Sequence, residues 1–120
     1  MPKKIIPKNG NVIDSTVYIY KGVNIMSAYA IFQINVTNKN EYEEYVKLAP
    51  SIVKKYQGEY IVRGGKLEVL LGKWDHPRTV IVKFPNYETA TKWYHSEEYF
   101  EIKKIREENS EGNCIIVNGV

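Results

Sequence analysis

Between residues 26 and 120, hydrophobic and polar positions repeat with a period that changes from two to about three and a half and back again. A period of two is typical of a half-buried strand, and the longer period is typical of a helix with one apolar face. Residues 28–36 show the shorter period, because every even position is apolar and the odd positions are mixed. The same pattern predicts further strands at residues 59–63, 67–72, 79–84 and 113–117.

A helix is expected directly after the first strand. Asn38 followed by Glu41 resembles a capping box, in which the first side chain accepts a hydrogen bond at the start of the helix. Apolar residues then recur every three or four positions: Tyr42, Tyr45, Val46, Ala49, Ile52, Val53 and Tyr56. Pro50 should kink this helix or split it in two, because proline has no backbone N–H. Gly58 is expected to end it.

Residues 59–63 and 67–72 are predicted to form a hairpin. The two glycines at 64 and 65 suit a two-residue turn that needs positive φ angles. In that register Val62 faces Leu67 and Tyr60 faces Val69, which gives one apolar face. The opposite face then carries Ile61, Arg63, Lys66 and Glu68. A loop at residues 75–77 separates this hairpin from the strand at 79–84.

A second helical segment is expected between that strand and the last one. Asn86 is a suitable cap, and Ser96 can start the helix again. Its inner stripe contains Tyr99, Ile102 and Ile105, and Gly112 should end it. The order is therefore strand, helix, strand, strand, helix, strand, with residues 67–72 and 79–84 taken as one strand that the loop at 75–77 interrupts. This order predicts an α+β fold of the ferredoxin-like βαββαβ type, with the helices on one face of an antiparallel sheet.

The other face of the predicted sheet has no helix to cover it. Its residues would be Tyr29, Ile31, Gln33, Ile61, Leu70 and Ile81. A patch so apolar is unusual on the surface of a monomer. A second copy of the chain, packed sheet against sheet about a two-fold axis, would cover it. The expected partner is therefore the protein itself, as a homodimer.

Charge is distributed unevenly along the chain. Residues 1–25 contain four lysines and one aspartate, which accounts for the whole formal net charge of +3. The remaining 95 residues are therefore neutral overall, and this argues against a nucleic-acid partner, because such a partner needs a basic face. No apolar run approaches the length of a membrane span, and no secretion signal is recognisable. A cytoplasmic location is expected.

The first 25 residues differ in character from the rest. They contain Pro2, Pro7 and the turn signal at residues 9–10, with a short strand indicated at 17–20. Residues 26–120 are expected to form one domain, and residues 1–25 an N-terminal extension. Two interpretations stay open for the extension. It is either a loosely ordered arm of the native protein or a segment upstream of a natural start at Met26.

Arg63 is the strongest candidate for a functional residue. Its planar guanidinium can bind a carboxylate, and the glycines beside it leave room for a ligand. The alternative is a cross-strand ion pair with Glu68. Tyr94 and Arg106 could reach the same cleft, or could serve packing alone, and Ser96 is better explained as a helix cap. The expected ligand-binding residues are Gln33, Arg63, Glu68, Tyr94 and Arg106.

Other residue types give weaker signals. His76 follows Asp75, which invites a dyad, but adjacent loop residues seldom have that geometry and Pro77 favours a plain turn. His95 is expected at a helix end. Cys114 lies in an apolar strand pattern and is better explained as a small buried residue than as a nucleophile. With one cysteine and two isolated histidines, no metal site is predicted, and no bound cofactor is expected.

Several segments together resemble the domain-of-unknown-function 1330 family of the dimeric α/β-barrel superfamily, over residues 26–120. They are Val62-Arg63-Gly64-Gly65, Glu68-Val69-Leu70, Gly72-Lys73-Trp74, residues 78–82, Phe84-Pro85, Trp93-Tyr94, Ser96, Glu98-Tyr99, Arg106 and residues 117–120. The resemblance implies two ferredoxin-like subunits paired as a dimeric barrel. Leu71, Lys83 and Glu97 depart from the family pattern, so any role of the usual residues there is in doubt.

The superfamily includes monooxygenases, isomerases, haem-degrading enzymes and proteins without a known reaction, so the fold does not select an activity. Two hypotheses follow. The first is a protein that binds or transforms a small carboxylated or aromatic molecule without a bound cofactor, with a cofactor-free monooxygenase as its most specific form. The second is a non-enzymatic dimerisation or interaction module. Whether the protein is an enzyme stays open at this point.

Overall fold

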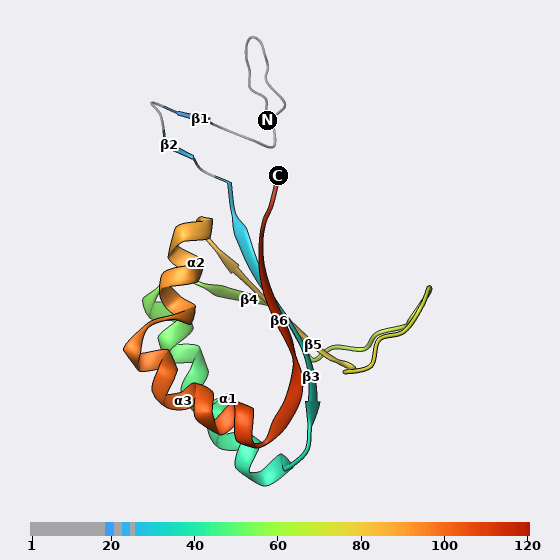
Figure 1. Ribbon diagram of the computed structural model, residues 1–120. Coiled ribbons are helices and arrows are strands. Elements are labelled where there is room, and N and C mark those ends of the chain that lie inside the picture. Colours follow the sequence, from blue (N-terminus) through green and yellow to red (C-terminus); the bar gives the residue numbers. More distant parts are fainter. Residues whose placement is uncertain (1–18, 21–22, 25) are drawn as a thin grey trace.

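The structure is a computed structural model and describes residues 19–20, 23–24 and 26–120. A four-stranded antiparallel sheet has the strand order β4-β5-β3-β6, and three helices cover one of its faces (Figure 1). The elements are β1 Ile19–Tyr20, β2 Val23–Asn24, β3 Ala28–Val36, α1 Lys39–Lys55, β4 Glu59–Arg63, β5 Arg78–Phe84, α2 Tyr87–Tyr94, α3 Glu97–Glu108 and β6 Ser110–Asn118. This is the predicted ferredoxin-like α+β fold. No helix in the described part of the chain is long and apolar enough to cross a membrane.

The N-terminal segment gives limited information. β1 and β2 pair with each other in an antiparallel two-stranded ribbon. The predicted strand at 17–20 overlaps β1 at residues 19 and 20, and residues 17 and 18 lie outside the described residues. Most of the predicted extension, residues 1–18, 21–22 and 25, lies outside them too, so both interpretations of it stay predictions.

β3 is the central strand and has the bounds predicted for it. Its even positions Ala28, Ala30, Phe32 and Ile34 are buried, whereas its odd positions are less so. It pairs with β5 and β6 over most of its length. Because successive side chains of a strand point to opposite faces, the even residues lie under the helices and the odd residues form the outer face.

α1 begins as predicted, with the Asn38 side chain accepting a hydrogen bond from the backbone N–H of Glu41. Its predicted apolar stripe is confirmed, since Tyr42, Tyr45, Ala49 and Val53 are buried and Val46, Ile52 and Tyr56 pack against them. The predicted split at Pro50 is wrong, because the helix is continuous from residue 39 to 55. Gly58 does not provide the left-handed residue at the helix end; Gln57 does, with φ 64°.

α2 and α3 begin at the two predicted caps. The side chain of Asn86 accepts from the N–H of Thr89, and that of Ser96 accepts from the N–H of Tyr99. The predicted stop at Gly112 is wrong: α3 ends at residue 108 and Gly112 lies inside β6. A Cβ atom there would lie 1.9 Å from the carbonyl oxygen of Gln33, so the glycine allows two strands to approach closely.

The predicted hairpin between residues 59–63 and 67–72 is wrong. Residues 67–72 form no strand, and β4 pairs instead with β5, with Tyr60 opposite Val82. Gly64 has the expected positive φ of 74°, but Gly65 does not. Residues 64–77 form a long connection, here called the arm, that extends away from the sheet (Figure 1). β5 takes the place that was predicted for residues 67–72, because the alternate apolar residues of β5 continue the buried face of the sheet.

A register shift in β4 changes which of its residues face the helices. The pairing moves by one residue between Tyr60 and Val62, so that Arg63 lies opposite Val80. Val80 is buried on the helix side, and Arg63 is therefore on that side as well. The predicted arrangement, with Arg63 on the face opposite Tyr60, is wrong because a single extra residue reverses the alternation.

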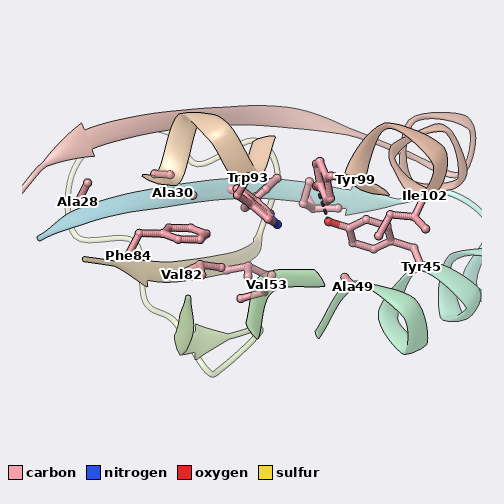
Figure 2. Close-up of a cluster of buried hydrophobic side chains, with 14 of the residues drawn as sticks. Ala28, Ala30, Tyr45, Ala49, Val53, Val82, Phe84, Trp93, Tyr99 and Ile102 are labelled. Atoms are coloured by element: carbon pink, nitrogen blue, oxygen red, sulfur yellow. Dashed lines mark hydrogen bonds between the residues drawn. The ribbon is translucent and has the colours of Figure 1, made fainter. Parts of the chain in front are cut away.

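The core is an aromatic cluster centred on Trp93, which is 1% exposed. Its ring lies 4.5 Å from that of Tyr99, 5.0 Å from Phe84 and 6.3 Å from Phe32, centroid to centroid. Figure 2 shows this cluster between the sheet and the helices, with the hydroxyl of Tyr45 directed at that of Tyr99. The core therefore ends, on the side of α1 and α3, in polar atoms.

The outer face of the sheet is largely apolar, as predicted. Ile31 of β3 lies between Ile81 of β5 and Ile115 of β6. Ile115 is 56% exposed in the single chain. Leu70, which was expected on this face, lies instead on the arm, where it is 85% exposed.

Candidate anion-binding cavity

A small cavity lies between the inner face of the sheet and the three helices. Its volume is about 20 Å³, which is room for roughly one water molecule. Its lining is Phe32, Ile34, Tyr42, Tyr45, Val46, Tyr60, Arg63, Arg78, Val80, Val82, Trp93 and Arg106. Every strand of the sheet except β6, and every helix, contributes to it. This arginine cavity is therefore formed by the tertiary fold rather than by one local motif.

The charge of this lining is one-sided. The chain has three arginines among its seventeen basic residues, and all three line the cavity. No aspartate or glutamate is among the described residues that line it. Residues 26–120 as a whole have no net formal charge, so the concentration of positive charge is specific to this place. An anion is the complementary ligand.

Arg106 is the deepest of the three, with 8% of its surface exposed. It enters the core because Tyr99, Ile102 and Arg106 follow helical spacing on the buried face of α3. Its Nη2 donates to the hydroxyl of Tyr94 at 3.3 Å. Within the described residues its one ion-pair contact is with Glu107 at 4.0 Å, and the Glu107 side chain is 58% exposed. A buried guanidinium therefore has no buried carboxylate beside it.

The tyrosines around Arg106 do not supply the missing negative charge. Burial raises the pKa of Tyr99 and, together with the neighbouring Tyr99, raises that of Tyr45 well above its usual range. Their hydroxyls share a hydrogen bond of 2.6 Å and are neutral at physiological pH. Arginine stays protonated in proteins. A buried charge is costly unless it is paired, so the site is electrostatically incomplete without an anion.

Three nitrogen donors of the lining residues have no partner. Nε of Arg106, Nε of Arg78 and Nε1 of Trp93 are buried and make no hydrogen bond within the described part of the chain. Buried donors are nearly always paired in folded proteins, so each such atom calls for an explanation. Three of them in residues around one cavity favour a ligand or water molecule at that position.

Arg63 is at the mouth of the cavity and is exposed. Its Nη2 donates to the backbone carbonyl of Val46 at 3.0 Å, and its guanidinium lies 4.5 Å from the centre of the Tyr60 ring. The predicted alternative of an ion pair with Glu68 has no support among the described ion pairs, which do not include these residues. Arg63 is therefore held by a neutral acceptor.

Arg78 lines both the cavity and a wider groove beside it. The entrance groove has a volume of about 290 Å³ and is lined by Val36, Lys39, Tyr42, Glu43, Val46 and Arg78. The Arg78 guanidinium lies over Gly64, where a Cβ atom would come within 2.2 Å of Nη1. A glycine at this position is thus required both by its φ of 74° and by the arginine above it.

The structure brings some of the predicted site residues together. Arg63 and Arg106 both line the cavity, and Tyr94 touches Arg106 from the neighbouring hollow. Gln33 pairs with Thr79 on the outer face of the sheet, so it is separated from the cavity by the sheet itself. Glu68 lies on the exposed arm, because the hairpin that would have placed it beside Arg63 does not form.

Sequence reasoning did not select Arg78, Tyr45 or Trp93. A usable signal for Arg78 was present, because arginine is rare in this chain and lysine is common. Where a chain supplies most of its surface charge as lysine, its few arginines are candidates for buried or bidentate contacts. Nothing in the sequence distinguished Tyr45 and Trp93 from other core aromatics.

The remaining candidate residues give no catalytic arrangement. Burial raises the pKa of the Cys114 thiol to about 11, which is unfavourable for a nucleophile. The Nδ1 atom of His76 has no hydrogen-bond partner within the described residues, so Asp75 does not orient it. Nowhere in the described part of the chain do three or more His, Cys, Asp or Glu side chains gather to form a metal site.

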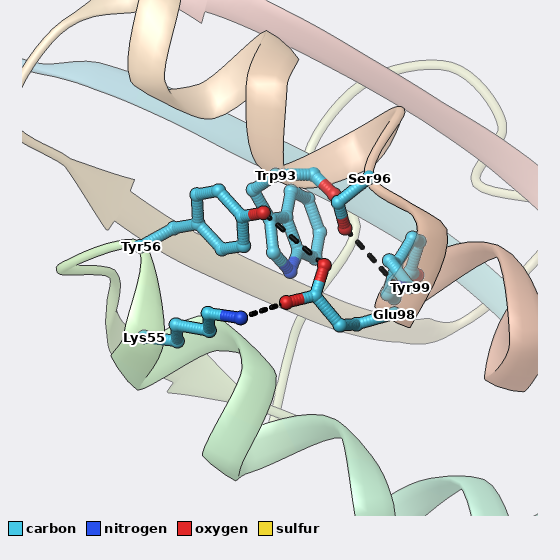
Figure 3. Close-up of polar contacts among 6 residues, drawn as sticks. All are labelled: Lys55, Tyr56, Trp93, Ser96, Glu98 and Tyr99. Carbon is cyan, nitrogen blue, oxygen red and sulfur yellow. Dashed lines mark hydrogen bonds and ion pairs between the residues drawn. The ribbon is translucent and has the colours of Figure 1, made fainter.

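Glu98 has a structural role next to the core. It accepts hydrogen bonds from Lys55 and from Tyr56 and so connects the end of α1 to the start of α3 (Figure 3). The hydrogen bond from Lys55 lowers the pKa of Glu98, and the same contact raises the pKa of Lys55. This contact joins the two helices that carry Tyr45 and Arg106.

The profile of the DUF1330 family, a domain of unknown function, matches residues 27–120. The chain belongs to the DUF1330 family. The match begins next to Met26 and includes the whole four-stranded sheet, all three helices and the arginine cavity. No match was found among curated proteins.

Solved structures share the fold of this DUF1330 chain at low sequence identity. A protein of unknown function from Rhodopseudomonas palustris has 13% identity and a TM-score of 0.65, over 80% of this chain and 84% of that one. SnoaB, a cofactor-independent oxygenase from Streptomyces nogalater, has 8% identity and a TM-score of 0.52, over 79% of this chain and 94% of that one. These similarities confirm the predicted ferredoxin-like α+β fold. At such identity they carry no activity across.

Proposed function

We propose that this protein binds a small organic anion in the arginine cavity. The observation that carries the proposal is Arg106, a buried permanent cation with no buried carboxylate beside it in the described structure. A bound carboxylate would supply the counter-charge and accept hydrogen bonds from the donors that lack a partner. Arg78 and Arg63, nearer the surface, add positive charge along the path from the entrance groove.

The walls of the cavity indicate the kind of anion. Five aromatic side chains surround the three arginines: Phe32, Tyr42, Tyr45, Tyr60 and Trp93. Such walls favour a flat, partly apolar body, whereas the arginines favour a planar acid group that can accept two parallel hydrogen bonds. A small aromatic carboxylate satisfies both requirements. This is the first of the two functions expected from the sequence, now with a specific site.

Binding is better supported than acid–base catalysis. Among its described residues the lining has no histidine, cysteine, aspartate or glutamate that could act as a general base. The tyrosines are unsuitable as bases, because their raised pKa values keep them protonated. A reaction in which the bound molecule supplies the reactive group itself is still compatible with this lining. The absence of a bound cofactor stays a prediction.

Matched acids and amides test the proposal. We expect benzoate, salicylate and succinate to raise the melting temperature at constant ionic strength, with the aromatic acids giving the larger shift. Benzamide and succinamide have similar shapes without the charge and should leave the melting temperature unchanged. The proposal is wrong if no acid stabilises the protein, or if the amides stabilise it as well as the acids.

A pair of charge variants locates the effect. Arg78→Gln removes a charge from the cavity wall, and Lys83→Gln removes one from the same strand on the other face of the sheet. Calorimetric titration should show weaker acid binding for Arg78→Gln and unchanged binding for Lys83→Gln. Equal losses in both variants would indicate non-specific attraction by net charge.

We also propose that residues 26–120 act as a homodimer in the cytoplasm, as the sequence predicts. The apolar outer face and the arm support self-association, because several large apolar side chains there are exposed in the single chain. A hollow of about 370 Å³ lies where the arm meets Val62, Thr79 and Ile81. If self-association were the sole role, the charged cavity on the other side of the sheet would have no use.

A further inference from the structure

The proline inside α1 leaves a carbonyl group without its usual donor. In an α-helix the carbonyl of residue i accepts from the N–H of residue i+4. For Val46 that residue is Pro50, which has no N–H to donate. Arg63, from the neighbouring strand β4, donates to this carbonyl at 3.0 Å instead. A side chain thus replaces the missing backbone hydrogen bond.

Two of these three residues lie at the mouth of the arginine cavity. Val46 and Arg63 both line it, and Val46 also lines the entrance groove. In this conformation the cavity of about 20 Å³ admits little more than one water molecule. A carboxylate therefore enters only if side chains at the mouth move. Arg63 is suited to this, because it is exposed and its guanidinium has an aromatic ring to slide along.

We propose that Pro50, Val46 and Arg63 form a latch that an anionic ligand opens. In the empty protein the Arg63 guanidinium is bound to the Val46 carbonyl, and on binding it transfers to the carboxylate of the ligand. The Val46 carbonyl accepts one hydrogen bond from Arg63, whereas a carboxylate carries the opposite charge and can accept two parallel hydrogen bonds from a guanidinium, so the transfer is favourable. This inference rests on the proposed function and names Pro50 as a residue that sets the affinity of the site.

If the latch exists, a substitution of Pro50 should raise the affinity of the site for acids. Replacing Pro50 by alanine restores an N–H for the Val46 carbonyl, which then holds Arg63 less strongly. Arg63 becomes available to the ligand, and the affinity for acids should rise about tenfold, the value of one hydrogen bond to a charged group. Pro50 itself offers no group to an anion, so a merely structural role would not produce this gain.

The experiment combines Pro50→Ala and Arg63→Met in a double-mutant cycle. Without ligand, Arg63→Met should lower the midpoint of urea unfolding in the parent protein. The same substitution should lower the midpoint less in Pro50→Ala, because the Val46 carbonyl is then already paired with a backbone N–H. With benzoate, salicylate and succinate, calorimetry should show the tenfold gain in Pro50→Ala and its loss when Arg63→Met is added. Ser51→Ala is the control, since it changes the next exposed position of α1 and leaves the Val46 carbonyl alone.

The outcomes separate the latch from the function on which it rests. Coupling in urea together with a gain in affinity supports the latch. Acid binding that is equal in the parent and in Pro50→Ala overturns the latch and leaves the proposed function in place. If none of the acids binds any variant, both are wrong, and coupling seen in urea alone then describes Arg63 as a structural replacement for the missing backbone bond.

Discussion

The arginines and the leucines of this chain reverse their usual places in a folded protein. The arginines line the inside of the fold, and the leucines lie on its surface. All three arginines line a cavity inside the fold, and one of them is almost fully buried. All four leucines are exposed by 40% or more, with Leu70 at 85% and Leu71 at 92%. Charged residues are seldom buried without a partner, and leucine is normally among the most buried residues.

The difference teaches that both regions are incomplete in the isolated chain, each in its own way. The cavity lacks negative charge, which a small molecule can supply. The arm lacks apolar cover, which only a large surface can supply. The sheet keeps the two apart, because the cavity opens on its helix side and the hollow beside the arm includes residues of its outer face. Two kinds of partner, one small and one macromolecular, are therefore expected on the two sides.

The largest effect is expected from Arg106→Met. Removing the buried cation should weaken acid binding by about 2–5 kcal/mol, the usual loss for one partner of a buried charge pair. The variant should also unfold at a higher temperature when empty, because an unpaired buried charge is replaced by an apolar side chain. Calorimetry and thermal unfolding measure the two effects, with the exposed Lys104→Met as control. A marked fall in melting temperature would instead show that Arg106 stabilises the empty fold.

The second effect concerns the arm. Replacing Leu70 and Leu71 together by serine should weaken self-association by roughly 3 kcal/mol, or on the order of a hundred-fold in Kd, if both side chains are buried in the dimer. Sedimentation velocity across a concentration series measures the change. Leu48→Ser is the matched control, because Leu48 is an exposed leucine on α1. A parent protein that stays monomeric at every concentration would refute the homodimer.

A smaller effect is expected at the two glycines where the arm begins. Gly64→Ala should destabilise the fold by about 1–2 kcal/mol, because its φ of 74° is unfavourable for a residue with a Cβ atom. It should also weaken acid binding, since the new methyl group displaces Arg78. Gly65→Ala should change neither quantity, because no atom lies within 4 Å of its Cβ position. Urea unfolding and calorimetry of both variants provide the comparison.

The smallest effect is a pH dependence from Glu98. Its pKa is lowered in the folded protein, chiefly by the hydrogen bond from Lys55, so the stabilisation is present at neutral pH and is lost as pH falls through the lowered value. Glu98→Gln should therefore reduce the melting temperature slightly at pH 7 and not at strongly acidic pH. Glu97→Gln, one residue earlier, is the matched charge control, because Glu97 is in none of the described ion pairs. A pH-independent difference would mean that the amide disturbs packing and that the ion pair contributes little.

Much of the fold was predictable from local signals. The alternation in residues 28–36 and the caps at Asn38, Asn86 and Ser96 depend on neighbours in sequence, and all of them are confirmed. The predictions that were wrong concern places where a residue or strand distant in sequence determines the local structure. Two adjacent glycines suggested a hairpin, but β4 pairs with β5, whose alternate residues Val80, Val82 and Phe84 are buried against the helices. Gly112 looked like a helix stop, whereas its small size serves the approach to Gln33.

The site was predictable in part. Arg106 was predicted as a site residue, and the structure places it on the same buried face of α3 as Tyr99 and Ile102. The meeting of Arg63 with Arg106 follows from a one-residue register shift in β4, which no sequence pattern announced. Glu68, expected beside Arg63, is absent from the lining because the predicted hairpin does not form. Donors without partners, such as Nε of Arg78, become visible only when the surroundings are known.

The placement of the two tryptophans has a practical consequence. Trp93 is in the wall of the arginine cavity and is 1% exposed, whereas Trp74 is on the arm and is 42% exposed. Their fluorescence should differ in colour, because an indole in a dry environment emits further to the blue than one in contact with water. Phenylalanine at position 74 would leave an optical reporter for the cavity, and phenylalanine at position 93 one for the arm. Ligand binding in the cavity and self-association through the arm can thus each be followed without an attached dye.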